Sequence, residues 1–398
     1  MGVPGLTGKT ILILSPQAWG KMFVSKHHYA IGLAKRGNTV YFLNPPDQEE
    51  TERKQEETER KEAIEITSSQ IDPHLFLIEH RLFFPYRLKF RALPLFHWLM
   101  KFHVSHLLKK INRPVDIVWS FDLGNLYPLH FFGKQPYKIF HPVDEPLHAP
   151  AIEAARGAEI IFSVTKEILE KYNQFKVPRH FINHGVSDEF LIADKPENSA
   201  GVSTRIGFSG NLLRPDIDRN TLLTIVKENQ DCTFEFWGSY TSGQANIGGA
   251  EDGATLEFIK ALQSCPHVVL HGAIDSSNLA KSIHSMGAFF ICYDVLKDQS
   301  RGTNYHKVME YLATGKVIIS NNVTTYKDQP ELVQMVKERT HNHSLPDLFR
   351  RVTRNLAAHN TPHLQELRIN FASENTYEKQ IIRIENLIAN QATINQLH

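Results

Sequence analysis

The sequence predicts an α/β protein made of two doubly wound parallel sheets that follow one another along the chain. Its 398 residues exceed the roughly 250–300 that one hydrophobic core can serve. Short apolar runs alternate with helical segments in both halves, and a stretch rich in Pro, Asn, Ser and Gly interrupts them near the middle. We therefore expect a first domain over residues 9–190, a linker over 191–204, a second domain over 205–375, and a closing helix over 376–395 that packs back on the first domain.

The first domain opens with a strand–helix–strand unit. Residues 11–14 are all Ile or Leu, the pattern of a strand buried on both faces of a sheet. A helix is expected over residues 25–35, ended by Gly37. Residues 39–43 (TVYFL) should form the next strand, because β-branched and aromatic residues favour strands and two prolines follow shortly afterwards.

Further strands of one parallel sheet are expected wherever such apolar runs recur in the first domain, at residues 116–120, 137–141, 159–163 and 180–183. The second domain repeats the pattern, with strands expected at residues 205–210, 233–238, 268–272, 288–293 and 317–320. A helix before the last of these should end at Thr314, with Gly315 as its left-handed cap.

Two segments of the first domain depart from this pattern. Residues 48–61 are a tandem duplication of QEETERK, in which no apolar residue occupies the seven-residue period, so a coiled-coil seam is excluded. Residues 81–110 are rich in both aromatic and basic side chains. We favour an arrangement in which these aromatics face the core and the cations point outward; the alternative is contact with an anionic membrane.

Composition excludes several classes of function. Lys and Arg total 44 against 43 Asp and Glu, so the chain lacks the positive field of non-specific nucleic-acid binding. Cys232, Cys265 and Cys292 have no CxxC spacing, which argues against a zinc site or a disulfide framework. The sequence shows no signal peptide and no run of 18 apolar residues. We expect a cytoplasmic protein that neither is secreted nor spans a membrane.

Four segments carry more specific information: residues 158–165 (AEIIFSVT), 183–186 (NHGV), 207–211 (GFSGN) and 306–316 (HKVMEYLATGK). In this order and spacing they resemble the bacterial GT-B glycosyltransferases of the large retaining family (family 1/4-like) that includes mannosyl- and glucosyltransferases of cell-surface polysaccharide synthesis. The resemblance covers nearly the whole chain. It implies two Rossmann-like domains that face a central cleft, a nucleoside diphosphate-sugar donor, and a saccharide or lipid-linked acceptor.

The resemblance also assigns donor-site residues. Residues 307–316 match the donor-site signature, in which Glu310 would hold the ribose hydroxyls. Lys307 shares its helical face and would stabilise the diphosphate as it leaves. Many members also carry an arginine and a lysine after the turn at Gly210; the lysine is missing here, and Arg214 is the candidate for a second cation at the diphosphate. Further expected donor contacts are Gly210, Asn211, Gly238, Gly272 and Asn304. The family often has another glutamate where this chain has Gly302, which leaves the sugar and the stereochemistry open.

In the first domain, the resemblance places His141 and Asp144 beside the transferred sugar as catalytic candidates. A histidine is as often structural as catalytic, so a structural His141 is the alternative. The acceptor side is expected to include Gly20, Ser25 and His28. Because adjacent residues cannot share a helical face, one of the neighbouring pair of histidines, His27 or His28, should be structural.

No metal or cofactor is expected. Asp216 and Asp218 mimic the DxD motif of metal-dependent glycosyltransferases, but we interpret Asp218 as a helix N-cap; the sugar nucleotide is a substrate. Two alternatives to a metal-independent hexosyltransferase-like enzyme remain: a catalytically silent GT-B scaffold or nucleotide-binding partner protein, and a GT-B sugar-nucleotide epimerase.

Overall fold

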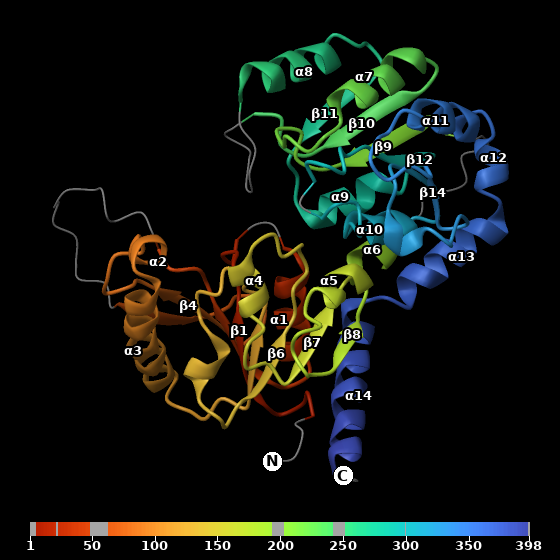
Figure 1. The fold of residues 1–398 in the computed structure, drawn as a ribbon. Helices are drawn as coiled ribbons and strands as arrows, with labels where there is room; N and C mark the ends of the chain where they lie inside the picture. Colours follow the sequence, from red (N-terminus) through yellow and green to blue (C-terminus); the bar gives the residue numbers. More distant parts are fainter. Residues whose placement is uncertain are drawn as a thin grey trace. The chain divides into compact units, whose positions relative to one another are not determined.

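The computed structural model describes residues 5–20, 23–47, 63–192, 203–241, 251–298 and 300–396, and the side chains of the last helix as far as Gln391. The charged repeat and most of the expected linker lie outside these ranges. The chain divides into two compact units, one formed by Met1–Asn183 with Tyr377–His398 and the other by His184–Thr376 (Figure 1). None of the described helices is long and apolar enough to cross a membrane.

Unit 1 contains an eight-stranded sheet in the order β3-β4-β2-β1-β5-β6-β7-β8. Its strands are β1 Thr10–Leu14, β2 Thr39–Leu43, β3 Ile64–Ser68, β4 Leu75–His80, β5 Ile117–Ser120, β6 Tyr137–Phe140, β7 Ile160–Ser163 and β8 Arg179–Phe181. Sequence analysis missed β3 and β4, and the expectation of an entirely parallel sheet was wrong, because β3 pairs with β4 in the antiparallel direction. β3 is an edge strand with alternating exposure, so it lacks the continuous apolar run that marked the others.

The helices of unit 1 are α1 Ser25–Lys35, α2 Leu88–Arg91, α3 Leu93–Ile111, α4 Ala149–Glu153, α5 Lys166–Glu170 and α14 Tyr377–Gln396, with a 3₁₀ turn at Leu129–Phe132. The bounds of α1 are those predicted. α14 packs against α1. Gly32 permits the approach, since a β-carbon there would lie 2.7 Å from Cδ1 of Ile381. An ion pair between Arg36, just after α1, and Glu385 of α14 adds to this contact.

The favoured interpretation of residues 81–110 was wrong for four of their six Phe and Trp side chains. Phe84 and Phe96 are buried in the core, whereas Phe83, Phe90, Trp98 and Phe102 are exposed, as are two leucines of the same stretch. Helices α2 and α3 lie at the periphery of unit 1 (Figure 1). Helix α3 therefore turns one apolar face to the core and a second apolar face to the surface.

Unit 2 contains a parallel sheet in the order β11-β10-β9-β12-β13-β14. Its strands are β9 Arg205–Ser209, β10 Thr233–Trp237, β11 Val268–Gly272, β12 Ala288–Ile291, β13 Val317–Ser320 and β14 Val333–Met335. Its helices are α6 Glu189–Ile192, α7 Arg219–Glu228, α8 Gly253–Gln263, α9 Ser276–Ile283, α10 Lys307–Ala313, α11 Leu345–Thr353, α12 Leu356–His359 and α13 Pro362–Ser373, with a 3₁₀ turn at Thr324–Tyr326.

Local sequence signals set several ends of these helices. The carboxylate of Asp218 accepts hydrogen bonds from the amide and hydroxyl of Thr221, which confirms the predicted N-cap of α7. Asp252 and Asp275 cap α8 and α9 in the same way. Gly315, with φ +77°, follows the C-cap of α10 in the left-handed conformation, as predicted.

Candidate functional site

The candidate site lies at the carboxyl edge of the unit 2 sheet. The strand order reverses between β9 and β12: the chain runs outward through β10 and β11 on one side and through β13 and β14 on the other. Ligands of doubly wound sheets bind beyond the carboxyl ends of the strands at such a switch point. Ser209 ends β9 and Ile291 ends β12, so these two residues mark the position.

Lys307 spans this switch point. Its Nζ donates hydrogen bonds to the carbonyl oxygen of Ser209 at 2.5 Å and to the hydroxyl of Tyr293 at 2.5 Å. The same ammonium lies 5.0 Å from the ring centre of Phe208 and 4.9 Å from that of Tyr293, within range of a cation–π interaction. Because the side chain is only 5% exposed, its charge is held in place at the junction of the two strands.

The next turn of α10 is tied to the same strand end. The hydroxyl of Tyr311 accepts a hydrogen bond from the amide of Ser209 at 2.7 Å and shares another with its Oγ at 2.9 Å. The Tyr311 ring stacks on Phe289 of β12, with the ring centres 4.1 Å apart. Helix α10, which carries the donor-site signature and which we call the signature helix, is thus fixed to both strands that flank the switch point.

Three predicted glycines lie at the ends of β9, β10 and β11. Gly210, Gly238 and Gly272 all have positive φ. A β-carbon on Gly238 would lie 2.0 Å from the carbonyl oxygen of Gly210, and one on Gly210 would lie 2.8 Å from Nζ of Lys307. Glycine is therefore required at position 238 by the close approach of a second backbone loop, and at position 210 by the close approach of Lys307. These contacts add to the need for a permissive backbone in a turn.

Glu310 lies one turn after Lys307 on α10 and is partly buried. Burial raises the pKa of Glu310 to about 7, while the positive charge of Lys307 opposes the rise and Glu189 adds to it. Burial also lowers the pKa of Lys307 to about 8, with Glu310 opposing. Shifts of this kind, caused by burial and a specific charged neighbour, are typical of functional sites.

Sequence analysis missed Glu189, the carboxylate that acts on Glu310. It belongs to α6 and accepts hydrogen bonds from the hydroxyls of Ser276 and Ser277, the first two residues of α9. A third hydroxyl, that of Ser187, donates to it at 3.0 Å. Its only signal in the sequence was its position three residues after the NHGV segment, which does not distinguish it from an ordinary surface glutamate.

Arg214 is placed near the candidate site but is already paired. Its guanidinium donates to both carboxylate oxygens of the buried Asp216, and this hydrogen bonding raises the pKa of Arg214 above its usual range. Part of its charge is therefore neutralised by the protein itself. Among the described residues, no cluster of three or more His, Cys, Asp or Glu is arranged to hold a metal ion.

The loop before α10 explains why glycine stands at position 302. Gly302 has φ +65°, and a β-carbon there would lie 2.6 Å from the carbonyl oxygen of Asn322, so this conformation leaves no room for a glutamate. Asp298 supplies the carboxylate of the loop and accepts hydrogen bonds from the amide of Gly302 at 3.0 Å and the hydroxyl of Tyr305 at 2.8 Å. Asp298, which sequence analysis missed, thereby holds the loop together.

Two predicted asparagines are also in unit 2. Asn211 follows Gly210, and its Oδ1 accepts a hydrogen bond from the amide of Leu213 at 2.9 Å, so it shapes the turn after β9. Asn304 is buried three residues before Lys307. The structure thus brings Gly210, Gly238 and Lys307 into direct proximity, while the part that either asparagine has in binding stays a prediction.

In unit 1, the structure separates the two neighbouring histidines. His27 is buried against Trp19, Phe23 and Phe42, and burial lowers its pKa to about 4, so it is the structural one. His28 is partly exposed and stacks on Tyr377 of α14.

The remaining acceptor-side candidates lie close to this pair in the chain. Ser25 is buried at the first position of α1, and Gly20 is exposed in the loop after β1.

His141 follows β6 and has no exposed surface. Its ring lies against Phe121 and Trp119, and neither ring nitrogen has a hydrogen-bond partner among the described residues. Burial lowers the pKa of His141 to about 3. The imidazole is therefore neutral at pH 7 and has no surface from which to contact a sugar. Asp144, three residues later, is exposed and lies near Lys26, a buried cation of α1 that sequence analysis missed.

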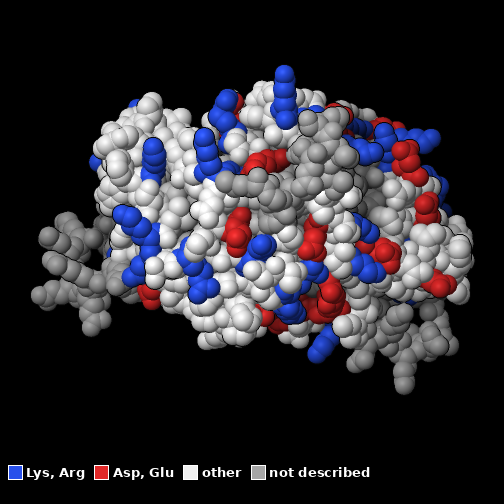
Figure 2. Space-filling model, turned by 90° about the horizontal axis from the view of Figure 1, so that it is seen from below, with Lys and Arg blue, Asp and Glu red and all other residues white. Residues whose placement is uncertain are grey.

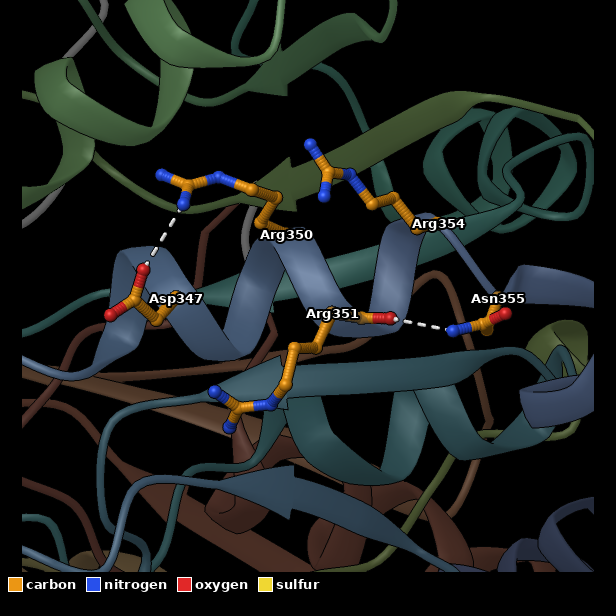
Figure 3. Close-up of a pocket in the computed structure, with 5 residues that line it drawn as sticks. All are labelled: Asp347, Arg350, Arg351, Arg354 and Asn355. Carbon is orange, nitrogen blue, oxygen red and sulfur yellow. Dashed lines mark hydrogen bonds and ion pairs between the residues drawn. The ribbon is translucent and has the colours of Figure 1, made fainter.

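A shallow hollow of about 370 Å³ on α11 does not belong to the candidate site. Figure 3 shows Arg350 and Arg354 on one side of the helix and Arg351 on the other. Arg350 already pairs with Asp347 and Glu228. The three guanidinium groups do not converge on one point, so this hollow lacks the geometry of an anion site.

Comparison with known proteins shows the fold. No protein-family model and no curated protein matches the sequence. Among solved structures, a sucrose-phosphate synthase from Thermosynechococcus elongatus matches with a TM-score of 0.70 at 12% identity, over 97% of this chain and 100% of its own. An alpha,alpha-trehalose-phosphate synthase (UDP-forming) from Burkholderia vietnamiensis matches with a TM-score of 0.66 at 11% identity, over 96% and 100%.

A third match is a lipopolysaccharide outer core galactosyltransferase in its apo form, with a TM-score of 0.62 at 11% identity, over 97% of this chain and 99% of the other. These structural neighbours are GT-B glycosyltransferases. The chain accordingly has the GT-B fold, with two Rossmann-like units built on largely parallel sheets.

Proposed function

We propose that the chain is a glycosyltransferase that moves a sugar, of hexose type, from a nucleoside diphosphate-sugar donor to a saccharide or lipid-linked acceptor in cell-surface polysaccharide synthesis. The observation that carries the proposal is the buried ammonium of Lys307 at the switch point of unit 2, with the carboxylate of Glu310 one helical turn away. One neighbour of the same fold, from E. coli, is described as bound with UDP-2-fluoro glucose, which supports a donor of this chemical class.

In this proposal the donor lies across the carboxyl edge of the unit 2 sheet. Glu310 accepts hydrogen bonds from the ribose hydroxyls, and Lys307 neutralises the diphosphate. The partly exposed backbone at Gly210 and Gly238 allows the nucleotide to approach closely, and Gly272, which is buried and has positive φ, shapes the neighbouring strand end. Asn211, Asn304 and the paired Arg214 are secondary contacts.

Catalysis is proposed to come from positioning and from stabilisation of the leaving diphosphate. Charge grows on the leaving phosphate as the glycosidic bond breaks, and a fixed ammonium in a dry environment stabilises that charge more than it stabilises the intact donor. Lys307 has both properties, because two hydrogen bonds and burial restrain it. The bond to the acceptor hydroxyl forms as the bond to the diphosphate breaks.

On the acceptor side, Asp144 is a better candidate than His141, because its side chain is exposed and that of His141 is not. In an inverting enzyme Asp144 would take the proton from the acceptor hydroxyl. In a retaining enzyme no such base is needed, because the leaving phosphate oxygen takes this proton. The left-handed Gly302 removes the second glutamate that often grips the sugar in the family, so both stereochemical courses remain within the proposal.

We further propose that transfer is metal-independent and cytoplasmic. The carboxylates of Asp216 and Asp218 are engaged by Arg214 and Thr221, which leaves cationic side chains to serve the diphosphate. All three cysteines are free, in keeping with a reducing compartment. Activity should be unchanged by a chelator. Loss of activity that magnesium or manganese restores would contradict metal independence.

The proposed function is tested by following release of nucleoside diphosphate from a panel of sugar nucleotides, with and without an acceptor extract. A transferase releases the diphosphate much faster with acceptor present. An epimerase converts the sugar nucleotide without any acceptor, and a silent scaffold binds nucleotide without releasing the sugar. Either of the last two outcomes would overturn the proposal.

A further inference from the structure

Helix α3 has two apolar faces, and the described part of the chain covers one of them. The buried face consists of Phe96, Met100, His103, Val104, Leu107 and Ile111. Leu95, Trp98 and Phe102 lie on another face at spacings of three and four residues, which places them on one line along the helix. They are 46%, 58% and 52% exposed.

The exposed face continues onto the preceding segment. Phe83 is 62% exposed, Phe90 is 77% exposed and Leu93 is 41% exposed. These three residues with Leu95, Trp98 and Phe102 form what we call the aromatic patch. It holds six of the fourteen large apolar side chains that are exposed among the described residues, within a stretch of twenty positions. Such concentration marks an interaction surface, whereas scattered exposed apolar residues carry no such meaning.

The charge around the aromatic patch has one sign. From Arg81 to Val115 the sequence contains eight Lys and Arg and no Asp or Glu, although the chain as a whole is nearly neutral. Arg87, Arg91 and Lys101 are exposed, and none of them forms an ion pair with another described residue. On the left of Figure 2, where α3 lies in Figure 1, blue side chains stand among uncharged atoms.

We propose that the aromatic patch and its surrounding cations dock unit 1 on an anionic lipid bilayer. Aromatic side chains with an apolar body settle at the headgroup level, and a helix with a basic margin lies in the plane of the interface. The centre of an interface with another protein is usually depleted of lysine. Unpaired cations of one sign around exposed Trp and Phe fit an anionic lipid surface better.

The docking has a consequence for the acceptor, and this consequence rests on the proposed function. Attachment to the bilayer would concentrate the enzyme where lipid-linked saccharides lie, so a lipid-linked acceptor in an anionic vesicle should be used faster than the same saccharide free in solution. Docking itself requires neither a donor nor an acceptor. The two hypotheses can therefore fail separately.

The test is co-sedimentation of the full-length protein with vesicles of phosphatidylcholine alone or mixed with phosphatidylglycerol. Binding is expected to the mixed vesicles at low salt and to fall as salt rises. Each Lys or Arg near such a surface contributes about five-fold to binding, so Arg87→Gln with Arg91→Gln should weaken it by more than about ten-fold. Trp98→Ser with Phe102→Ser should weaken binding even at low salt.

Matched control variants lie in unit 2. Arg351→Gln with Arg354→Gln removes two exposed cations of α11, and Leu296→Ser removes an apolar side chain that is 75% exposed. Both controls should bind vesicles like the parent protein. Far-UV circular dichroism and thermal unfolding of each preparation show that the variants are folded. Nucleoside diphosphate binding is measured separately, and its failure in the parent protein would reject the proposed function and leave docking standing.

Three outcomes would overturn docking. The first is equal binding of the parent protein to neutral and mixed vesicles, or binding to neither. The second is binding of the patch variants that equals that of the controls. The third is a dimer, seen by light scattering, that Trp98→Ser with Phe102→Ser dissociates without any binding to lipid, which would show that a second copy of the chain covers the aromatic patch.

Discussion

The hydroxyl of Tyr311 lies 2.7 Å from the amide nitrogen of Ser209. Tyr311 follows Glu310 in α10, and Ser209 is the last residue of β9, whose carbonyl oxygen accepts the hydrogen bond from Lys307. Ser209 is therefore held at both of its backbone groups: its amide bonds to Tyr311 and its carbonyl bonds to Lys307, and both of these side chains belong to α10. This arrangement fixes the proposed ribose ligand and the proposed phosphate ligand relative to the same strand.

Tyr311→Phe should destabilise unit 2 by about 1–3 kcal/mol, because it leaves the buried amide of Ser209 without its acceptor. Urea unfolding measures the change. Tyr240→Phe serves as a control, since the Tyr240 hydroxyl makes no hydrogen bond with the described residues, and it should leave stability nearly unchanged. Equal stability of Tyr311→Phe and the parent would show that the hydrogen bond contributes little.

The pH dependence of kcat/KM should be bell-shaped. The pKa of Glu310 is raised to about 7. Because the carboxylate must be ionised to accept hydrogen bonds from two hydroxyls, kcat/KM should rise as the pH increases through this region. The pKa of Lys307 is lowered to about 8. Because its amine must be protonated to stabilise the diphosphate, kcat/KM should fall as the pH rises above this value. Glu310→Gln should abolish the acidic limb and keep the alkaline one. An unchanged acidic limb in Glu310→Gln would assign it to another group.

Lys307→Ala should lower turnover more than it lowers affinity for the donor, because the ammonium acts on charge that grows in the transition state. Removing one such donor costs roughly 10²–10³ in rate. Lys307→Arg should recover only part of the loss, since a planar guanidinium does not fit the positions of Ser209 and Tyr293 in the same way. Steady-state kinetics give both constants, and near-normal turnover in Lys307→Ala would move the phosphate role to Arg214.

Much of the fold was predictable because its signals are local. Continuous apolar runs marked the central strands, and Asp218 and Gly315 marked helix ends through their own backbone chemistry. The edge strand β3 was missed because it is exposed on alternate residues and does not show such a run.

The candidate site was predictable only in part. The resemblance indicated Lys307 and Glu310, but the bonds that hold Lys307 join residues 98 and 14 positions away in the chain, and no periodicity reports these. The pairing of Arg214 with Asp216, the burial of His141 and the role of Glu189 likewise depend on tertiary packing. Aromatic residues on α3 could not be divided between core and surface, because both of its faces are apolar.

The central claim is that Glu310 binds the ribose of a nucleoside diphosphate. It is tested most directly by calorimetric affinities for the tightest-binding nucleoside diphosphate of a panel and for its 2′-deoxy form, in the parent protein and in Glu310→Ala. A hydrogen bond to a charged group contributes about 1.5–3 kcal/mol, so the parent should prefer the ribose form by at least about ten-fold. In Glu310→Ala the preference should disappear while the fold is retained. An equal preference in both proteins, or no binding of any nucleoside diphosphate to the parent, would contradict the assignment.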